Sequence, residues 1–456
     1  MVTLTASVVG AVIVALDGTV LTVAQPALRR DLRASLIQVQ WTSTGYLIAV
    51  ASLLVFAGRL GDHHGHRRVF ALGMTGFAVA SAAIGVAPGI GWVIGLRVVQ
   101  GVFGALLQPA TLGMLRAAYP PEELGMPIAL RTGAIGVAAA AGPLVGGALV
   151  SGFGWRAVFF LGVAPALAMG ALAAFVPEPE RPPGSSPVSA RRLDLPGAGL
   201  LATALVGLVY ALVGIPDSGW TALSTSALVA AAAAGCAFVR HERRAASPLL
   251  PADVLRSPAV GRALGLLVAA SAAMLGTLFV SSYVLQDVLG LDPLRTALRA
   301  LPAPVAMVAS APASAVLMRR YGARRTAAVA MVVLALGVLS LSRLAEASAV
   351  VWAGMGFVLV GAGFGTVMVT ATAVVVRQVP VASAGVAGAL QQTALNVGPT
   401  VGVAATSTLM TCTNAAPGPT LTALAGVALL GVPLVPRLPG RSEARTTATE
   451  GPAPVP

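Results

Sequence analysis

An aspartate and an arginine lie inside long apolar stretches of this sequence. Asp17 falls in the stretch 3–25, and Arg97 falls in the stretch 91–115. Ionisable side chains in apolar segments are costly, and they are usually paired or functional. A carboxylate can take up and release a proton, and a nearby guanidinium influences that reaction. We therefore expect Asp17 and Arg97 to form a proton-coupling site. The alternative is a static ion pair that holds two helices together.

The composition around these residues is that of a membrane protein. Hydrophobic residues make up 57% of the 456 positions, charged residues make up 10%, and the mean hydropathy is +0.87. Soluble domains carry about 25% charged residues. The composition excludes a soluble enzyme, a disordered protein and a nucleic-acid binder. It also excludes an outer-membrane barrel, whose strands alternate between apolar and polar residues.

Apolar runs separated by Gly, Pro or charged clusters predict the membrane-spanning helices. The expected fold class is an all-α polytopic membrane protein with fourteen transmembrane helices. The predicted spans are 3–25, 42–60, 69–88, 91–115, 127–150, 156–176, 195–214, 221–239, 262–284, 297–318, 325–344, 349–376, 383–411 and 420–436.

The arginines indicate the orientation of these spans. All 29 basic residues are arginine, and the formal net charge is +13. If the N-terminus is cytoplasmic, 21 arginines fall on inner loops or ends and seven fall on outer ones. This distribution follows the positive-inside rule. It predicts that both termini are cytoplasmic and that the number of helices is even.

Two short strings recur in equivalent places along the chain. The string around Gly65, which precedes Arg67 and Arg68, is repeated around Gly322, and "GPLVGG" (142–147) is repeated as "GPTVGV" (398–403). Repeated halves are typical of secondary transporters. We predict a six-helix bundle at 1–180, a cytoplasmic linker with an inserted helix pair at 181–245, a second six-helix bundle at 246–440, and a disordered cytoplasmic tail at 441–456.

Polar side chains on the predicted spans are candidates for a substrate cavity near Asp17. Interhelical hydrogen bonding, which is common in membrane bundles, is the alternative for each of them. The candidates are Thr22, Gln25, Tyr46, Gln100, Gln108, Gln392 and Asn396.

Small residues and a proline make the predicted span 127–150 a close-packed and bendable helix. Gly142, Gly146 and Gly147 allow close approach of a neighbouring helix, and Pro143 removes a helical hydrogen bond. The loop "GRLGDHHGHRR" (58–68) holds three histidines beside Asp62. The loop is too short for us to expect a metal site there. No catalytic residues and no cofactor are predicted.

Together these motifs resemble the fourteen-helix drug:proton antiporter-2 branch of the major facilitator superfamily. "LDGTVLTVAQPAL" (16–28) is similar to the signature of its first helix, and "GRLGD" (58–62) is similar to its loop motif. "RVVQG" (97–101) and "GPLVGG" (142–147) are similar to its motifs in the fourth and fifth helices. The resemblance covers the chain from about residue 10 to residue 436.

The resemblance implies a proton-coupled antiporter that exports small lipophilic compounds, such as antibiotics, across a bacterial plasma membrane by alternating access. Asp17 and Arg97 occupy the family's coupling positions. Asp62 would lock the outward-open state by facing the helix that begins near Val381–Gly385, or by pairing with Arg116. The resemblance assigns conformational gating to Gly58, Asp62, Gly65, Arg67 and Arg116, and to Gly142, Pro143, Gly146 and Gly147.

The sequence also departs from the family pattern. Thr22 and Gln25 replace the common Asn and Leu of the first helix, Ala138 replaces a glycine, and Gly162 replaces a frequent asparagine. These differences affect the expected substrate range more than the fold. The second half has no clear intramembrane acid, which favours neutral, zwitterionic or monovalent substrates.

Other classes of membrane protein fit less well. A membrane enzyme needs a nucleophile or a metal cluster, a channel needs charge rings or a filter loop, and an ATP-driven pump needs a phosphate-binding loop with lysine. The expected partners are a drug-like molecule, protons and the lipid bilayer, without nucleic acid, and the expected state is a monomer. An exporter of one endogenous metabolite and an uncoupled facilitator remain alternatives.

Overall fold

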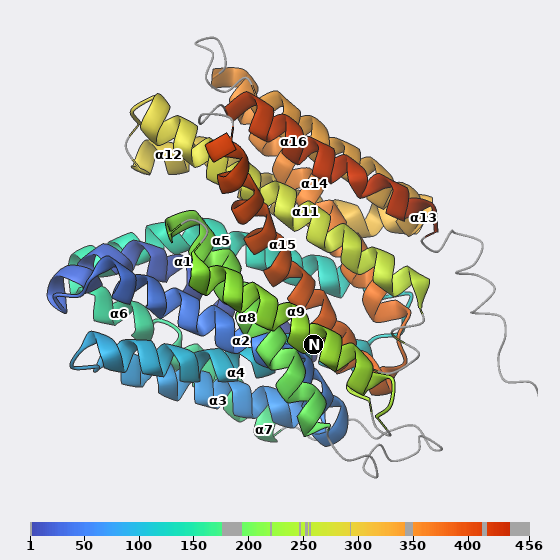
Figure 1. The fold of residues 1–456 in the computed structure, drawn as a ribbon. Helices are drawn as coiled ribbons and strands as arrows, with labels where there is room; N and C mark the ends of the chain where they lie inside the picture. The colour runs from blue at the N-terminus through green and yellow to red at the C-terminus, as the bar shows by residue number, and fades with distance from the viewer. Residues whose placement is uncertain are drawn as a thin grey trace, which may run out of the picture. The chain divides into compact units, whose positions relative to one another are not determined.

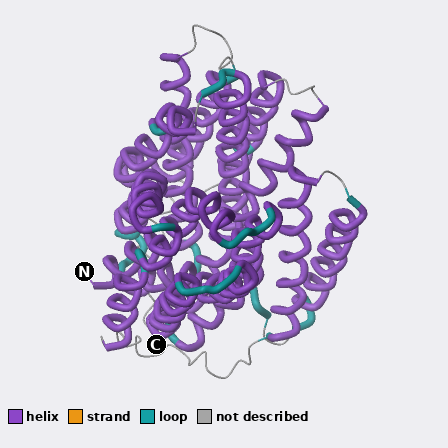
Figure 2. Tube along the Cα trace, turned by 90° about the vertical axis from the view of Figure 1, so that its left-hand side faces the viewer, coloured by secondary structure: helices purple, strands orange, loops and turns teal. Residues whose placement is uncertain are grey.

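The structure, a computed structural model, consists of helices joined by short loops (Figures 1 and 2). It describes residues 2–175, 194–218, 221–245, 248–250, 254, 257–291, 293–342, 350–412 and 417–437, and no strand occurs among them. The predicted tail and most of the predicted linker up to residue 193 lie outside these residues.

The helices of the described chain are long and apolar. They are α1 (Val2–Asp31), α2 (Leu36–His64), α3 (His66–Gly85), α4 (Ile90–Ala118), α5 (Gly125–Phe153), α6 (Trp155–Phe160), α7 (Val163–Phe175), α8 (Leu195–Ser218), α9 (Ala222–Glu242), α11 (Pro258–Tyr283), η2 (Val284–Val288), α12 (Pro293–Ala300), α13 (Pro302–Leu341), α14 (Val350–Arg377), η3 (Val381–Ser383), α15 (Ala384–Cys412), α16 (Pro417–Leu430) and η4 (Val432–Arg437).

Each predicted span falls on one or more of these helices. The predicted span 156–176 is divided between α6 and α7, and the spans 297–318 and 325–344 lie mostly within α13. Among the described residues, eleven helices are long and apolar enough to cross a membrane. The chain is therefore an all-helical membrane protein, and the count of fourteen crossings stays a prediction.

Two glycines that the repeat pairs in sequence also share an unusual backbone conformation. Gly65, between α2 and α3, has φ 95° and ψ 129°. Gly322, where the two halves of α13 meet, has φ 85° and ψ 160°. Positive φ values are strained for residues with a Cβ atom, so glycine permits both sharp turns. The agreement supports the internal repeat at the level of the backbone.

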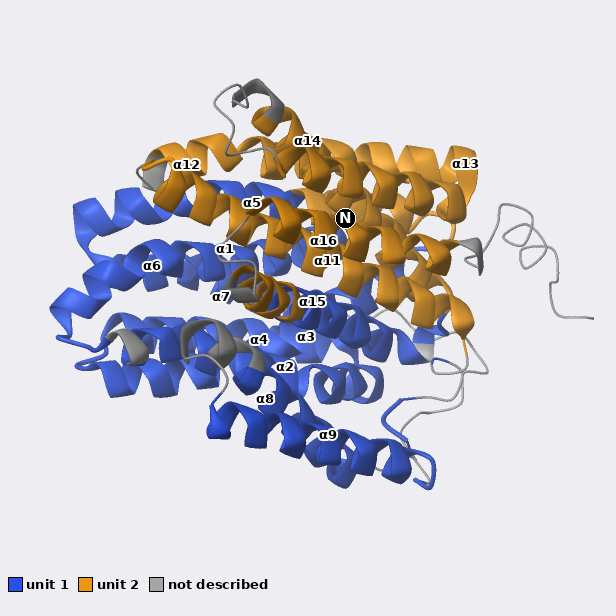
Figure 3. Ribbon diagram, turned by 45° about the horizontal axis from the view of Figure 1, so that its top comes forward, with its two compact units in different colours: residues 1–121, 134–254, 379–400 blue, residues 122–133, 255–378, 401–456 orange. Residues whose placement is uncertain are grey.

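The chain forms two compact units (Figure 3). Unit 1 contains residues 1–121, 134–254 and 379–400, and unit 2 contains residues 122–133, 255–378 and 401–456. The first residues of α5 belong to unit 2, and the first residues of α15 belong to unit 1. The domain bounds inferred from the sequence stay a prediction.

Unit 1 packs α2, α3 and α4 against one another, with α1 beside α4 and α7 beside α3. The helix pair α8–α9 packs against α2, where Trp41 and Tyr210 bring their ring centroids within 6.0 Å. Phe70, Met74 and Phe77 of α3 are buried in the main hydrophobic cluster of this unit. The cluster fixes α3 beside α1 and α4, which carry the charged residues singled out from the sequence.

Unit 2 is held mainly by the packing of α13 against α14, with α11 and α16 beside them. Small residues bring these helices close together. A Cβ atom built on Gly363 of α14 would lie 2.6 Å from the Leu334 nitrogen of α13. Close backbone approach of this kind is how helices associate in a bilayer.

Candidate functional site

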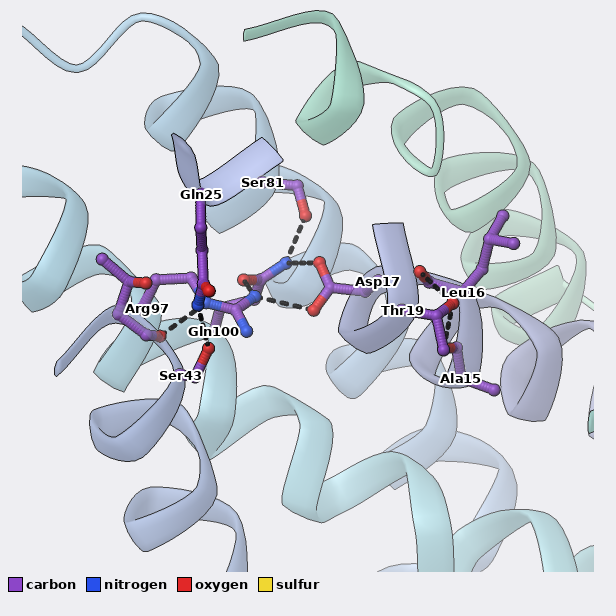
Figure 4. Close-up of polar contacts among 10 residues, drawn as sticks. Ala15, Leu16, Asp17, Thr19, Gln25, Ser43, Ser81, Arg97 and Gln100 are labelled. Carbon is purple, nitrogen blue, oxygen red and sulfur yellow. Dashed lines mark hydrogen bonds and ion pairs between the residues drawn. The ribbon is translucent and has the colours of Figure 1, made fainter. Parts of the chain in front are cut away.

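Asp17 and Arg97 form an ion pair inside unit 1 (Figure 4). Arg97 Nη1 lies 2.6 Å from Asp17 Oδ2, and the two side chains are 1% and 11% exposed, respectively. Helix α1 carries the acid and α4 carries the base. Removing one partner of a buried ion pair leaves the other charge without compensation, so each of these two charges stabilises the other.

Gln100 joins the pair and connects it to α3. Its Nε2 atom donates to Asp17 Oδ1 at 3.1 Å and to Ser81 Oγ at 2.6 Å (Figure 4). Its Oε1 atom accepts from Arg97 Nη1 at 2.5 Å. Residues three apart share a helix face, which explains why Arg97 and Gln100 reach the same carboxylate. We call Asp17, Arg97, Gln100 and Ser81 the coupling cluster.

Two residues of α2 hold the Arg97 guanidinium in place. Arg97 Nε donates to the Thr42 carbonyl oxygen at 3.0 Å, and the Tyr46 ring lies under the guanidinium with its centroid 4.3 Å from Cζ. A cation over an aromatic face is attracted by the ring, most strongly where water is excluded. Arg97 therefore keeps neutral partners when Asp17 binds a proton.

An apolar cavity of about 260 Å³ reaches the coupling cluster from within unit 1. Helices α1, α3, α6 and α7 line it, and Asp17 and Ser81 are its polar members beside apolar residues such as Ile13 and Phe77. An aqueous proton or a lipophilic group that entered this cavity would meet the carboxylate.

The other residues predicted to line a substrate cavity have different partners. Gln25 Nε2 donates to Ser43 Oγ at 3.0 Å, and Thr22 Oγ1 donates to the Thr19 carbonyl at 2.6 Å. Gln392 Nε2 donates to Asn396 Oδ1 at 3.4 Å within α15, as their i, i+4 spacing suggests. The structure thus brings Tyr46 and Gln100 to the ion pair, whereas a cavity role for Thr22, Gln25, Gln108, Gln392 and Asn396 stays a prediction.

Asp62, near the end of α2, contacts the start of α15, as expected from the sequence. Its Oδ1 atom accepts from the Gly385 N–H at 2.8 Å, and its Oδ2 atom accepts from the Val386 N–H at 3.2 Å. His66 Nε2 lies 3.2 Å from Oδ1. Asp62 is 7% exposed, and the partial positive charge of a helix N-terminus favours a carboxylate there. Its pairing with Arg116 stays a prediction.

Gly58 allows this contact to form. A Cβ atom built on Gly58 would lie 2.5 Å from the Gly385 carbonyl oxygen and 3.0 Å from the Ala389 Cβ atom. A larger residue would force α2 and the start of α15 apart. The loop motif therefore supplies both the acceptor, Asp62, and the space in which it works.

The glycines predicted to pack α5 closely divide into two kinds. Cβ atoms built on Gly142 and Gly146 would collide with Thr19 and Val20 of α1, so these glycines permit the contact between the two helices. Gly147 has open space at the same position. Pro143 lies inside α5. The gating role assigned to these residues stays a prediction.

A second buried carboxylate was missed because it lies in a charged string. The string "RHERR" (240–244) is typical of a solvated helix end, but Glu242 within it is only 8% exposed. Glu242 accepts from the Leu250 N–H, and Arg59 of the loop motif donates to the Pro248 carbonyl oxygen. Leu249 and Leu250 are buried in the main cluster of unit 1. Residues 248–250, after α9, thus contact both the end of α9 and the loop motif.

Ser81 was also missed, because one serine in an apolar helix carries no distinctive pattern. We expect Ser81→Ala to lower proton-driven export about fivefold to tenfold, since a buried amide N–H without a partner costs about 1–3 kcal/mol.

The measurement is transport in vesicles over a range of pH values. Ser81→Thr keeps the hydroxyl group and should restore export. Ser52→Ala is a matched control, because Ser52 Oγ donates to the Ala49 carbonyl within its own helix. Transport by Ser81→Ala equal to that of the wild type would show that the hydrogen bond from Gln100 to Ser81 is not needed for transport.

Comparisons with known proteins identify the family of the chain. Residues 8–403 match the model of the Major Facilitator Superfamily. The chain is 40% identical over 412 residues to the tetracenomycin C resistance and export protein of Streptomyces glaucescens, covering 90% of this chain and 75% of that protein. It is 32% identical over 412 residues to the multidrug resistance protein Stp of Mycobacterium tuberculosis, covering 89% and 74%.

The fold is similar to that of solved transporters. The human organic anion transporter MFSD10 superimposes with a TM-score of 0.69 at 16% sequence identity, over 95% of this chain and 99% of that one. Taken with the family match over residues 8–403, these relationships show that the chain belongs to the major facilitator superfamily of membrane transporters.

Proposed function

We propose that this protein exports small lipophilic compounds from a bacterial cell in exchange for protons. The observation that carries the proposal is the coupling cluster, a desolvated Asp17–Arg97 pair beside an apolar cavity. A carboxylate in that setting can bind one proton at a time, and an apolar cavity accepts lipophilic groups. Relatives named for tetracenomycin C export and for multidrug resistance support the same class of cargo.

In the proposed cycle, Asp17 alternates between a charged state and a protonated state. When it is charged, it holds Arg97 and Gln100. A proton arriving from the outside neutralises it, and Arg97 then keeps its hydrogen bonds to Gln100 and to the Thr42 carbonyl oxygen. Release of the proton to the cytoplasm restores the ion pair. No cofactor is needed, since the proton gradient supplies the energy.

The proposed topology has fourteen membrane crossings and both termini in the cytoplasm of a plasma-membrane protein. This orientation places Asp62 and its contact with Gly385 and Val386 at the cytoplasmic end. The contact would close that end while the opposite end is open. We propose that one chain is sufficient for transport, because the coupling cluster is complete within it.

The second candidate is an exporter of one endogenous compound. The relative named for tetracenomycin C supports it, because that name specifies a single compound, whereas the name of Stp specifies many drugs. The coupling cluster serves either cargo. The difference would lie in the residues that line the substrate path.

The test is efflux from an efflux-deficient bacterial host that expresses the protein, with ethidium, tetracenomycin C and a panel of antibiotics. We expect export of at least one compound, and we expect a protonophore to stop it. Export that persists with the protonophore would contradict proton coupling. A membrane-inserted protein that exports none of these compounds would favour the single endogenous substrate.

A further inference from the structure

Unit 2 carries a groove that the transport cycle does not use. Its volume is about 420 Å³, within the range of roughly 300–1,000 Å³ found for ligand sites. Leu317 and Tyr321 from the first half of α13, Val329 and Val333 from the second half, and Ala362 from α14 form much of its wall. The sharp turn at Gly322 brings the two halves of α13 to the same groove.

The groove is open to the surroundings of unit 2 along its apolar length. Val329 is 63% exposed, Tyr321 is 44% exposed and Leu317 is 40% exposed. Exposed apolar side chains of this size fit a hydrocarbon environment rather than water. A groove of this kind takes an acyl chain in the bilayer, because its wall has the same polarity as the lipid tails.

One end of the groove is strongly basic. Arg325 is part of its wall, and Arg320 holds its guanidinium 5.4 Å from the Tyr321 ring centroid. Arg324 is exposed beside them. Among the residues that the structure describes, no aspartate or glutamate lines the groove. Clustered arginines beside an apolar groove attract the phosphate of an anionic lipid headgroup, because guanidinium groups bind phosphate with paired hydrogen bonds.

We propose that this groove binds one anionic phospholipid, with an acyl chain along Leu317, Val329 and Val333 and its phosphate on Arg320 and Arg325. The positive-inside orientation proposed above places the basic end in the cytoplasmic leaflet, where anionic lipids attract basic residues. A second copy of the chain is a poorer occupant. A two-fold interface would set the arginines of one copy against those of the other. A lipophilic cation is disfavoured by the same charges.

The test is native mass spectrometry of the purified full-length protein in detergent. It compares phosphatidylglycerol with phosphatidylcholine that carries the same acyl chains. We expect one phosphatidylglycerol to be retained in preference to phosphatidylcholine. Replacing Arg320 and Arg325 together by alanine should weaken that preference about 25-fold, or about fivefold for each arginine near the surface.

Two further variants separate the groove from general charge. Arg319→Ala removes the same charge from the same helix end. Arg319 lies near Arg377, whereas Arg320 lies over the ring of Tyr321, which lines the groove, so Arg319→Ala should keep the preference. Ala362→Phe fills the groove and should reduce retention of both lipids while it leaves the arginines in place. Thermal unfolding checks that each variant is folded.

Three outcomes would overturn the proposal. They are equal retention of the two lipids by the wild type, an equal loss in Arg319→Ala and in the double variant, or displacement of the lipid by inorganic phosphate alone. The last would indicate a small-anion site without an acyl chain. The assay does not depend on transport, so its result stands whether or not the protein proves to be a proton-coupled exporter.

Discussion

Asp17→Asn is expected to reduce proton-driven export to the background level, a loss of at least about 100-fold. Asparagine keeps the size of the side chain and one oxygen for Arg97, but it cannot bind and release a proton. It also leaves the guanidinium of Arg97, which is 1% exposed, without a counter-charge. Removing one partner of a buried pair costs about 3–5 kcal/mol, which corresponds to two or more decades in an equilibrium.

The measurement is uptake into inside-out vesicles energised by a pH gradient. Substrate exchange without a gradient is measured in the same vesicles. We expect Asp17→Asn to lose the first activity and to retain the second, because exchange needs the substrate path and not the proton. Retained exchange also shows that the variant is folded. Asp17→Glu keeps a titratable group and should recover part of the gradient-driven activity.

A matched control lies on the same helix. Asp31, at the end of α1, pairs with Arg156 at 2.5 Å, but their side chains are 48% and 42% exposed. Surface ion pairs contribute little, at about 0–1 kcal/mol. Asp31→Asn should therefore leave export within about twofold of the wild type. Full gradient-driven export by Asp17→Asn would return the Asp17–Arg97 pair to a structural role.

The charged members of the coupling cluster could be predicted because a charge in an apolar run is conspicuous. Gln100 follows from its spacing with Arg97. Ser81 could not be predicted, since serine is common in membrane helices and its partner lies on another helix. Only the packing of α3 beside α4 reveals that contact.

Local charge was a misleading guide at the end of α9. Glu242 stands between arginines, and such a string normally lies in water. Leu249 and Leu250 lie in the core of unit 1, and the Leu250 N–H donates to the Glu242 carboxylate. Sequence periodicity describes one element at a time, so it does not show which segment will fold over another.

The two glycines of the repeated loops illustrate the opposite case. A positive φ angle is a local property that glycine itself permits, so glycine at both positions allows the same kind of turn. Gly65 and Gly322 accordingly turn in similar ways. Their surroundings differ, however. Gly65 follows the end of α2, which carries Asp62, whereas the position that corresponds to Asp62 before Gly322 is Arg319. The resemblance between the halves therefore does not extend to their chemistry.

Asp62→Asn is expected to lower export about tenfold or more by opening the contact between α2 and α15. The carboxylate accepts from two backbone N–H groups, at Gly385 and Val386. An asparagine has one acceptor oxygen, so its amide nitrogen would face one of these donors. A charge-assisted hydrogen bond contributes about 1.5–3 kcal/mol, which corresponds to a shift of roughly 10-fold to 150-fold in the population of the closed contact.

The opening can be measured directly with a buried thiol. Val386 is 0% exposed, and Val386→Cys changes the side chain little and keeps the backbone N–H. In a background in which Cys236 and Cys412 are replaced by serine, maleimide should label this position slowly. Adding Asp62→Asn should accelerate labelling about tenfold or more, in step with the lost hydrogen bond. Asp194→Asn, which removes a carboxylate that pairs with His241, is the matched control and should not accelerate labelling.

Labelling and export together distinguish a gate from a structural contact. A gate held closed by Asp62 predicts that the two change in parallel, because the same population controls both. Asp62→Glu, which keeps the charge on a longer side chain, should lie between the wild type and Asp62→Asn in both measurements. If Asp62→Asn lost export while the thiol stayed protected, the carboxylate would be needed for something other than closing this end. The contact with Gly385 and Val386 would then be a consequence of the packing permitted by Gly58.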